Sequence, residues 1–199
     1  MKRRNKILLA AATVMLLGVF VFPLWQIRLQ APQYPEGLGL NIRINTVQSL
    51  HPHNIQTIND LNHYIGMQAI RPDAVPALKI MPYAVILLVI MGLLTVIISS
   101  RAMLISWLAV FVGMALAGFA DFYKWEYDYG HHLNPHAAIK VPGMTFQPPL
   151  IGGKQLLNIH ATSIPGIGGI ILFLSLLIGI YVLVNEIRAS RLARAEQAL

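Results

Sequence analysis

Residues 80–98 read IMPYAVILLVIMGLLTVII, and after the short segment 99–101 a second run, residues 102–120, reads AMLISWLAVFVGMALAGFA. Neither run contains a charged side chain. Each reaches the roughly 18 residues that an α-helix needs to cross a hydrocarbon layer about 30 Å thick. Because so short a connection allows only antiparallel neighbours, the stretch predicts a transmembrane helical hairpin.

Two further apolar runs, residues 7–25 and 164–184, are also long enough to span a membrane. The whole chain is 56% hydrophobic and 12% charged, whereas soluble domains carry about 25% charged residues. The first run is longer than the core of a secretory signal peptide and ends in FPLWQIRLQ, without a small-residue cleavage site, so we interpret it as an uncleaved signal anchor. The predicted fold class is an all-α membrane protein, with four transmembrane helices and a small extracytoplasmic cap formed by two long loops.

The positions of Lys and Arg predict the orientation of these helices. Four basic residues lie in MKRRNK before the first helix, Arg101 lies in the hairpin turn, and Arg188, Arg191 and Arg194 follow the last helix. By the positive-inside rule, both termini are cytoplasmic and both loops are periplasmic, in a multi-pass protein of the inner membrane. The predicted division is a cytoplasmic N-terminus 1–6, helix 7–25, loop 26–79, helix 80–98, turn 99–101, helix 102–121, loop 122–163, helix 164–184 and a basic tail 185–199.

The two loops carry patterns that predict folded structure. Apolar residues recur at helical spacing from residue 55 to residue 65, which predicts an amphipathic helix that ends near Gly66. Alternation over residues 40–44 is typical of a short strand. We expect the two loops to pack on each other in one cap.

All seven histidines fall in these loops, and the stretch GHHLNPH, residues 130–136, holds three of them. The spans contain no histidine, which excludes a bis-histidine haem between the helices, and no charged residue in mid-span, which argues against a pump. The chain has no cysteine, no G-x-S-x-G elbow, no P-loop and no dinucleotide fingerprint. Nor do basic and aromatic residues alternate as in a nucleic-acid groove. The sequence therefore predicts neither an enzyme nor a nucleic-acid-binding protein.

Metal binding is one interpretation of the histidines. His63 and Met67 stand four residues apart on the predicted helix and so share one face. With His131 and Met144 from the other loop they offer imidazole and thioether ligands, which suit Cu(I), whereas carboxylate with imidazole suits Cu(II) or Zn(II). The other interpretation is structural: hydrogen bonds or a protein interface. It applies to each histidine, and above all to His51 and His53, which flank Pro52. For His132, His136 and His160 both interpretations stay open.

Several stretches resemble a family of small membrane proteins encoded in bacterial nitrous oxide reductase (Nos) gene clusters. They are FPLW and APQYPEGLG after the first helix, LNHYIGM before the second, WEYDYGH after the third, and IKVPGM, QPPLIG and KQLLN before the fourth. The resemblance covers residues 22–165, within which the helices match only in apolar character. Where the family has a form close to GHNLDP, this chain reads GHHLNP, which puts His132 in doubt as a ligand.

The resemblance implies a function in denitrification. It implies a membrane-anchored accessory protein for the maturation of an extracytoplasmic copper enzyme, nitrous oxide reductase, by copper handling or assembly. The implied partners are the lipid bilayer and the copper enzyme or its maturation factors, and the implied cofactor is Cu(I). The implied ligands are His63, Met67, Asp128, His131 and Met144. The alternatives are a docking subunit that binds these partners without metal, and a membrane subunit that supports electron supply.

Overall fold

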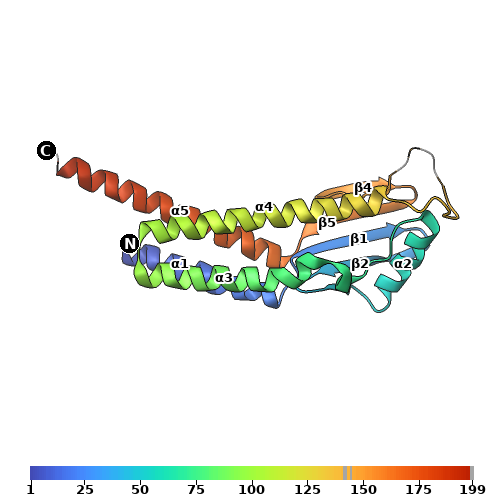
Figure 1. Ribbon diagram of the computed structural model, residues 1–199, viewed down its shortest axis with the longest axis horizontal. Coiled ribbons are helices and arrows are strands. Elements are labelled where there is room, and N and C mark those ends of the chain that lie inside the picture. The colour runs from blue at the N-terminus through green and yellow to red at the C-terminus, as the bar shows by residue number, and fades with distance from the viewer. Residues whose placement is uncertain (141–142, 144, 198–199) are drawn as a thin grey trace.

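The protein, described from a computed structural model, is elongated, with a helical bundle at one end and a sheet at the other (Figure 1). The structure describes residues 1–140, 143 and 145–197, and only the backbone of 193–196. Met144, one of the predicted ligands, lies outside the described residues.

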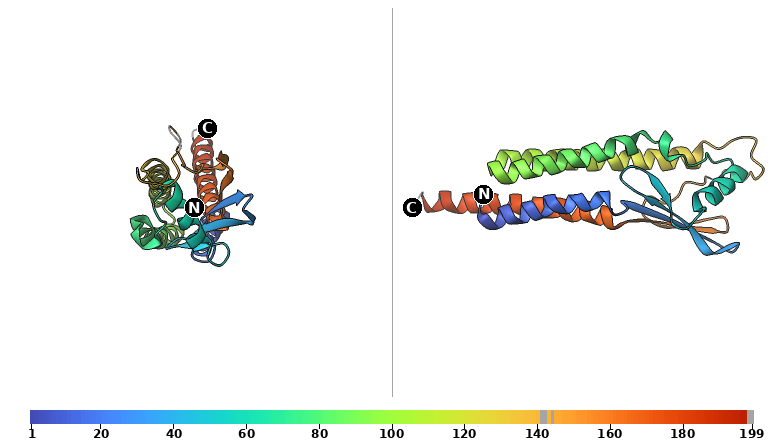
Figure 2. Two further views of the ribbon diagram at one scale, coloured as in Figure 1. Left: turned by 90° about the vertical axis from the view of Figure 1, so that its right-hand side faces the viewer. Right: turned by 90° about the horizontal axis from the view of Figure 1, so that it is seen from below.

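The bundle contains four helical segments. The first is α1 (Arg3–Met15), which continues as the 3-10 helix η1 (Leu16–Phe20). The others are α3 (Pro76–Ile98), α4 (Arg101–His131) and α5 (Ile167–Glu196). Two views together show α1 beside α5 and α3 beside α4 (Figure 2). The C-terminal part of α5 projects past the rest of the bundle (Figure 1).

Trp107 forms the centre of the bundle core. Its side chain is fully buried, and its indole N–H donates to the backbone oxygen of Leu88, 2.9 Å away. Gly179 of α5 lies directly against the ring, where any side chain would clash. A small residue therefore lets two helices approach closely, as is common between helices in membranes.

Three helices are long and apolar enough to cross a membrane: α3, α4 and residues Ile167–Leu192 of α5. The prediction of one regular α-helix over residues 7–25 is wrong. The α-helix there has 13 residues and tightens into η1. Trp25, the predicted last residue of that helix, begins a strand instead.

The predicted all-α fold is also wrong, because five strands form an antiparallel sheet. They are β1 (Trp25–Ala31), β2 (Tyr34–Ile42), β3 (Val47–Ser49), β4 (Gly152–Leu156) and β5 (Ile159–Pro165). Their order in the sheet is β3-β2-β1-β5-β4. Because β1 and β5 are neighbours, the regions before α3 and after α4 form one folded unit, which we call the cap.

The sheet has one covered face and one exposed face, because side chains alternate along each strand. Ile27 and its cross-strand partner Ser163 lie on the covered face and are buried. Arg28 and its partner Thr162 lie on the opposite face, where Arg28 is exposed and Thr162 is half-buried. One apolar face and one polar face are typical of antiparallel sheets.

The helix between β3 and α3 and the end of α4 cover the apolar face of the sheet, which carries Ile27. The predicted amphipathic helix is confirmed as α2 (Asn54–Ile65), which ends at Gly66 with a φ of 82°. Its Ile58 packs with Leu38 and Leu40 of β2. The short strand expected near residue 40 is confirmed as part of β2.

Two helices continue beyond the predicted spans. Residues 122–131, predicted as loop, are the last turns of α4, and most of the predicted tail 185–199 is the end of α5. A 31-residue helix is about 46 Å long at 1.5 Å per residue, which exceeds a hydrocarbon layer of about 30 Å. The end of α4 therefore belongs to the cap.

Candidate functional site

Aromatic side chains hold the end of α4 against the sheet. The ring of Trp25 on β1 contacts Phe119 and Phe122, with centroids 5.7 and 5.6 Å away. The indole N–H of Trp25 donates to Ser163 Oγ at 2.7 Å, and Ser163 Oγ donates to the Leu150 oxygen at 3.1 Å. One tryptophan thus links β1, β5, the segment before β4 and α4.

About two turns further along α4, the segment that precedes β4 crosses the helix. The backbone N–H of Phe146 donates to the Gly130 oxygen at 3.0 Å. Gly130 is buried, and a Cβ atom there would overlap the backbone of Gln147. Glycine is therefore required for this crossing.

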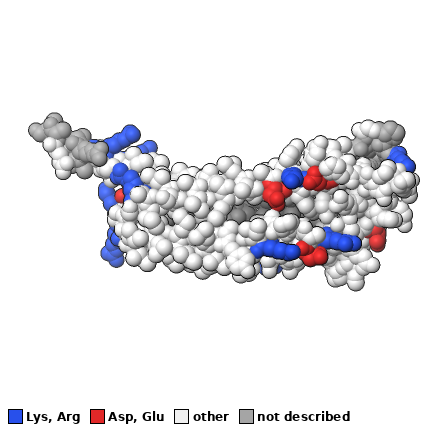
Figure 3. Space-filling model, viewed as in Figure 1, with Lys and Arg blue, Asp and Glu red and all other residues white. Residues whose placement is uncertain are grey.

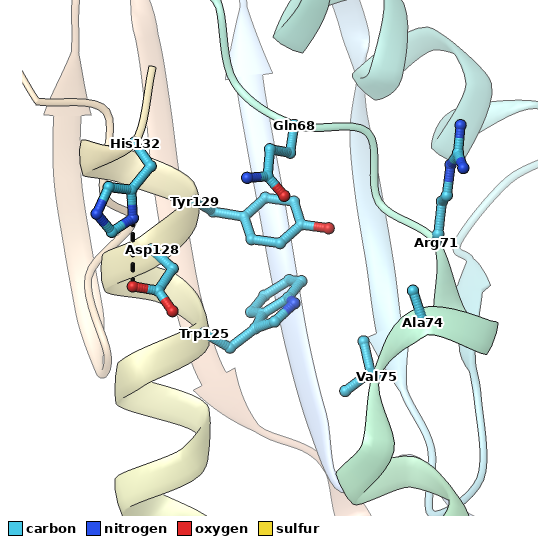
Figure 4. A pocket seen from close by; sticks show the side chains of 8 residues that line it. All are labelled: Gln68, Arg71, Ala74, Val75, Trp125, Asp128, Tyr129 and His132. Carbon is cyan, nitrogen blue, oxygen red and sulfur yellow. Dashed lines mark ion pairs between the residues drawn. The ribbon is translucent and has the colours of Figure 1, made fainter. Parts of the chain in front are cut away.

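A pocket of about 320 Å³ lies between the end of α4 and the segment that leads into α3. Its residues are Gln68, Arg71, Ala74, Val75, Trp125, Asp128, Tyr129 and His132 (Figure 4). The segment includes the 3-10 helix η2 (Pro72–Ala74).

Two aromatic rings form the middle of the pocket. The rings of Trp125 and Tyr129 have centroids 4.5 Å apart, and the Tyr129 hydroxyl donates to the Ala69 oxygen at 2.9 Å. Burial raises the pKa of this hydroxyl, and contacts with Arg71 and Trp125 lower it by less. The indole N–H of Trp125 is buried, and among the described residues no acceptor forms a hydrogen bond with it.

Asp128 and Arg71 lie on opposite sides of the pocket. Asp128 lies at one end with Oδ1 3.4 Å from Nδ1 of His132, and Arg71 lies at the other end (Figure 4). The Asp128 side chain keeps 43% of its surface exposed and is therefore accessible to a ligand. The pocket thus combines a partly exposed carboxylate with two aromatic rings, whereas the guanidinium of Arg71 points away from these rings (Figure 4).

Glu126 is the one fully buried acidic residue among the described residues. It directly follows Trp125, a residue of this pocket, in the sequence. Neither carboxylate oxygen has a hydrogen-bond partner in the described residues. Burial raises the pKa of Glu126 to about 8, because a charged carboxylate is unfavourable away from water. The residue lies past the apolar run, in the part of α4 that belongs to the cap.

The predicted metal ligands lie on two segments that meet. His63 is exposed on α2, and Met67 is half-buried just after Gly66. The backbone N–H of Asn134 donates to the Gly66 oxygen at 2.8 Å, and that of Ile139 donates to the Tyr64 oxygen at 2.9 Å. The segment after α4 is thereby joined to the end of α2.

The side chains of the predicted set have other contacts. The ring of His131 stacks on Tyr127 with centroids 3.8 Å apart, and its Nδ1 lies 3.0 Å from the Tyr127 oxygen. Asp128 pairs with His132. Within residues 1–140, 143 and 145–197, no three His, Asp or Glu side chains form a group that could hold a metal ion.

The remaining histidines are spread over the cap. His51 and His53 flank the turn before α2, where His53 has a φ of 65°. The backbone N–H of His136 donates to Asn134 Oδ1 at 2.9 Å. His160 lies on the exposed face of β5. The GHHLNPH stretch is therefore the end of α4 and the turn that joins it to α2.

Sequence reasoning missed the pocket residues Arg71, Trp125 and Tyr129 and the buried Glu126. A partial signal was present, since Trp125 and Tyr129 stand four residues apart and so share a helical face. A comparison with protein-family models and with curated protein sequences finds no match to this chain.

Proposed function

We propose that this protein is a membrane-anchored accessory protein whose cap binds a partner protein outside the cytoplasmic membrane. The observation that supports this most is the cap itself: strands from both sides of the α3–α4 hairpin form one sheet. Helices cover one face of the sheet, and the other face is exposed and polar. Such a rigid polar face, held at a fixed distance from a membrane, suits the binding of a protein.

The exposed face provides hydrogen-bonding groups and a positive charge. Arg28, Gln30 and His160 are exposed on adjacent strands, and Gln30 pairs with His160 across β1 and β5. The resemblance to the family from nitrous oxide reductase gene clusters supplies the class of partner. We propose that the partner is the copper enzyme or one of its maturation factors.

The charge distribution supports the proposed orientation. On the face shown in Figure 3, basic side chains gather at the end of the bundle that holds the N-terminus, and a band without charged residues separates them from the cap. We propose that this band lies in the membrane, with both termini in the cytoplasm. α1 and η1 would cross with the other helices, because 13 and 5 residues span together about 30 Å at 1.5 and 2.0 Å per residue.

Reporter fusions test the orientation. A reporter that is active only outside the cytoplasm should be active when fused after Lys154 and inactive when fused after Arg101. The reverse pattern would refute the proposed orientation.

A binding measurement tests the docking role. Purified protein in detergent should bind purified nitrous oxide reductase or a maturation factor from its gene cluster, and Arg28→Glu should weaken this binding at least about tenfold by reversing a charge at the interface. Lys124→Glu is the matched control, because Lys124 is exposed on α4 away from the sheet's polar face. If the parent binds none of these proteins, or both variants bind as the parent does, the docking role is wrong.

Copper handling is the second candidate function. It is favoured by the two backbone hydrogen bonds that join the segment after His131 to the segment between His63 and Met67. Under anaerobic Cu(I) titration, Met67→Leu and His131→Ala should lose affinity, and His132→Ala should lose much less. Unchanged Cu(I) binding in the first two variants, or none in the parent, would leave docking without metal as the function.

A further inference from the structure

Basic side chains gather at the end of the bundle that holds both termini (Figures 1 and 3). Residues 1–6 hold four basic residues, the turn 99–101 holds one, and residues 185–191 hold two, whereas Glu186 is the one acidic residue in these segments. We call six of the seven the basic surface: Lys2, Arg3, Arg4, Lys6, Arg101 and Arg188. All are exposed except Lys6, which is half-buried. The surface therefore carries an excess of positive charge that other molecules can reach.

Three segments that are remote in the sequence meet at this surface. The backbone N–H of Lys2, before α1, donates to Glu186 Oε1 of α5 at 3.0 Å. The guanidinium of Arg101, at the start of α4, donates to the backbone oxygen of Glu186 at 3.1 Å. Asn5 Nδ2 also donates to Glu186 Oε1, at 2.6 Å. The carboxylate of Glu186 thus accepts from uncharged N–H groups, and within the described residues no Lys or Arg of the basic surface forms an ion pair.

With the apolar runs in the membrane, the basic surface lies at the depth of lipid headgroups. Lys6 and Arg101 each directly precede an apolar run, whereas Lys2 and Arg188 lie five and four residues outside theirs. At 1.5 Å per residue these positions are about 2–8 Å beyond the hydrocarbon layer. Headgroups occupy roughly the next 5–8 Å on each side of a bilayer. Arg191, three residues further along α5, lies about 10 Å beyond the hydrocarbon by the same measure and is therefore left out of the surface.

The charge of the surface selects the type of headgroup. A basic residue close to an anionic leaflet strengthens binding about fivefold, whereas a zwitterionic headgroup has no net charge to attract. The guanidinium of Arg101 uses one N–H group for the Glu186 oxygen, and its other N–H groups can bind phosphate oxygens. The first turns of α1 and α4 also lie here and contain no acidic residue, so their free backbone N–H groups add to the positive potential.

We propose that the basic surface binds the phosphate of an anionic phospholipid in the cytoplasmic leaflet, with Lys2 and Arg101 as the main contacts. These two residues are favoured because both are joined to Glu186, so that one headgroup meets charges from α1 and α4 at their junction with α5. A bound lipid would offset the repulsion among the basic side chains and link the three helix ends at the membrane surface. The inference rests on the proposed orientation, and it does not depend on the identity of the protein partner.

Native mass spectrometry of the full-length protein tests this inference. The protein would be released from nanodiscs that hold equal amounts of phosphatidylglycerol, phosphatidylethanolamine and phosphatidylcholine with the same acyl chains. Two basic contacts, at about fivefold each, predict that retained phosphatidylglycerol exceeds each of the other two lipids roughly ten- to thirtyfold. Equal retention of the three lipids, or a preference for one of the zwitterionic lipids, would overturn the proposal.

Charge-removing variants and matched controls locate the binding. Arg101→Gln should lower the preference for phosphatidylglycerol about fivefold, and the double variant with Lys2→Gln should bring the three lipids close to equal retention. Arg101→Lys keeps the charge and should keep most of the preference, which separates the charge from the hydrogen bond to the Glu186 oxygen. Lys79→Gln and Lys124→Gln remove exposed lysines from the other side of the membrane and should behave as the parent does. A parent-like preference in the double variant, or an equal loss in the two controls, would refute the site.

A competition experiment distinguishes a lipid from a soluble anion. Glycerophosphoglycerol has the same headgroup without acyl chains, and at the concentration of the lipid it should displace little of it. If it binds as tightly as the lipid, the source of the ligand is soluble and the lipid assignment is wrong. Because no partner protein is present, failure here is separate from failure of the docking role, and the reporter fusions test the orientation on their own.

Discussion

Replacing Glu126 with Gln is predicted to remove a pH dependence from the stability of the cap. Glu126 is fully buried, and burial raises its pKa from 4.5 to about 8. Between these two values the folded protein binds a proton that the unfolded chain releases. The free energy of unfolding therefore falls as the pH rises from 4.5 toward 8, and this contribution is fully present only below the lower value.

The size of the effect follows from the interval between the two pKa values. An interval of about 3.5 units, at about 1.4 kcal/mol per unit, sets an upper limit of about 5 kcal/mol at pH 8. Gln is close to Glu in shape and does not ionise in this range. Glu126→Gln should therefore match the parent near pH 5 and exceed its stability by about 2–5 kcal/mol at pH 8.

Thermal unfolding of the detergent-solubilised protein at several pH values measures this difference. At about 2–4 °C per kcal/mol for a chain of this size, the midpoint of the variant should lie at least about 4 °C above that of the parent at pH 8. Asp121→Asn, which removes an exposed carboxyl group from the same helix, is the control and should follow the parent. Identical pH profiles for the parent and Glu126→Gln would refute the reasoning.

The remaining predictions concern the attachment of α4 to the sheet. Trp25→Phe keeps an aromatic ring but removes the donor to Ser163 Oγ, so we expect a loss of about 1 kcal/mol in unfolding experiments; a loss above about 3 kcal/mol would show that the ring itself was displaced. Gly130→Ala places a methyl group against the backbone of Gln147, and faster hydrogen exchange at residues 145–150 should follow. Gly113→Ala is the matched control, because the space around Gly113 is open within the described residues; equal exchange in both variants would contradict the proposed crossing.

The hairpin and the amphipathic helix could be predicted from the sequence because each depends on neighbours in the chain. The run of residues 80–98 and the spacing of apolar residues in α2 are local patterns, and both elements lie where these patterns predict them. Residues 25–30 also alternate between apolar and polar side chains, but they follow directly on an apolar run, which concealed the start of β1.

The sheet could not be predicted because its central pairing is remote in the sequence. Trp25 and Ser163, whose side chains meet across β1 and β5, stand 138 residues apart. No local pattern shows which strands become neighbours over such a distance. The pocket was missed for the same reason, since Arg71 and Asp128 come together only when the segment before α3 lies beside the end of α4.

Photo-crosslinking in cells tests the central claim, partner binding by the exposed face of the sheet, most directly. A photoreactive amino acid would replace Arg28 on that face, Thr162 on the neighbouring strand, or Lys124 on α4 as the control. The account predicts crosslinks from the first two positions to nitrous oxide reductase or one of its maturation factors, and few from Lys124. Crosslinks of equal yield from all three positions, or none from the two sheet positions in cells that contain these proteins, would contradict it.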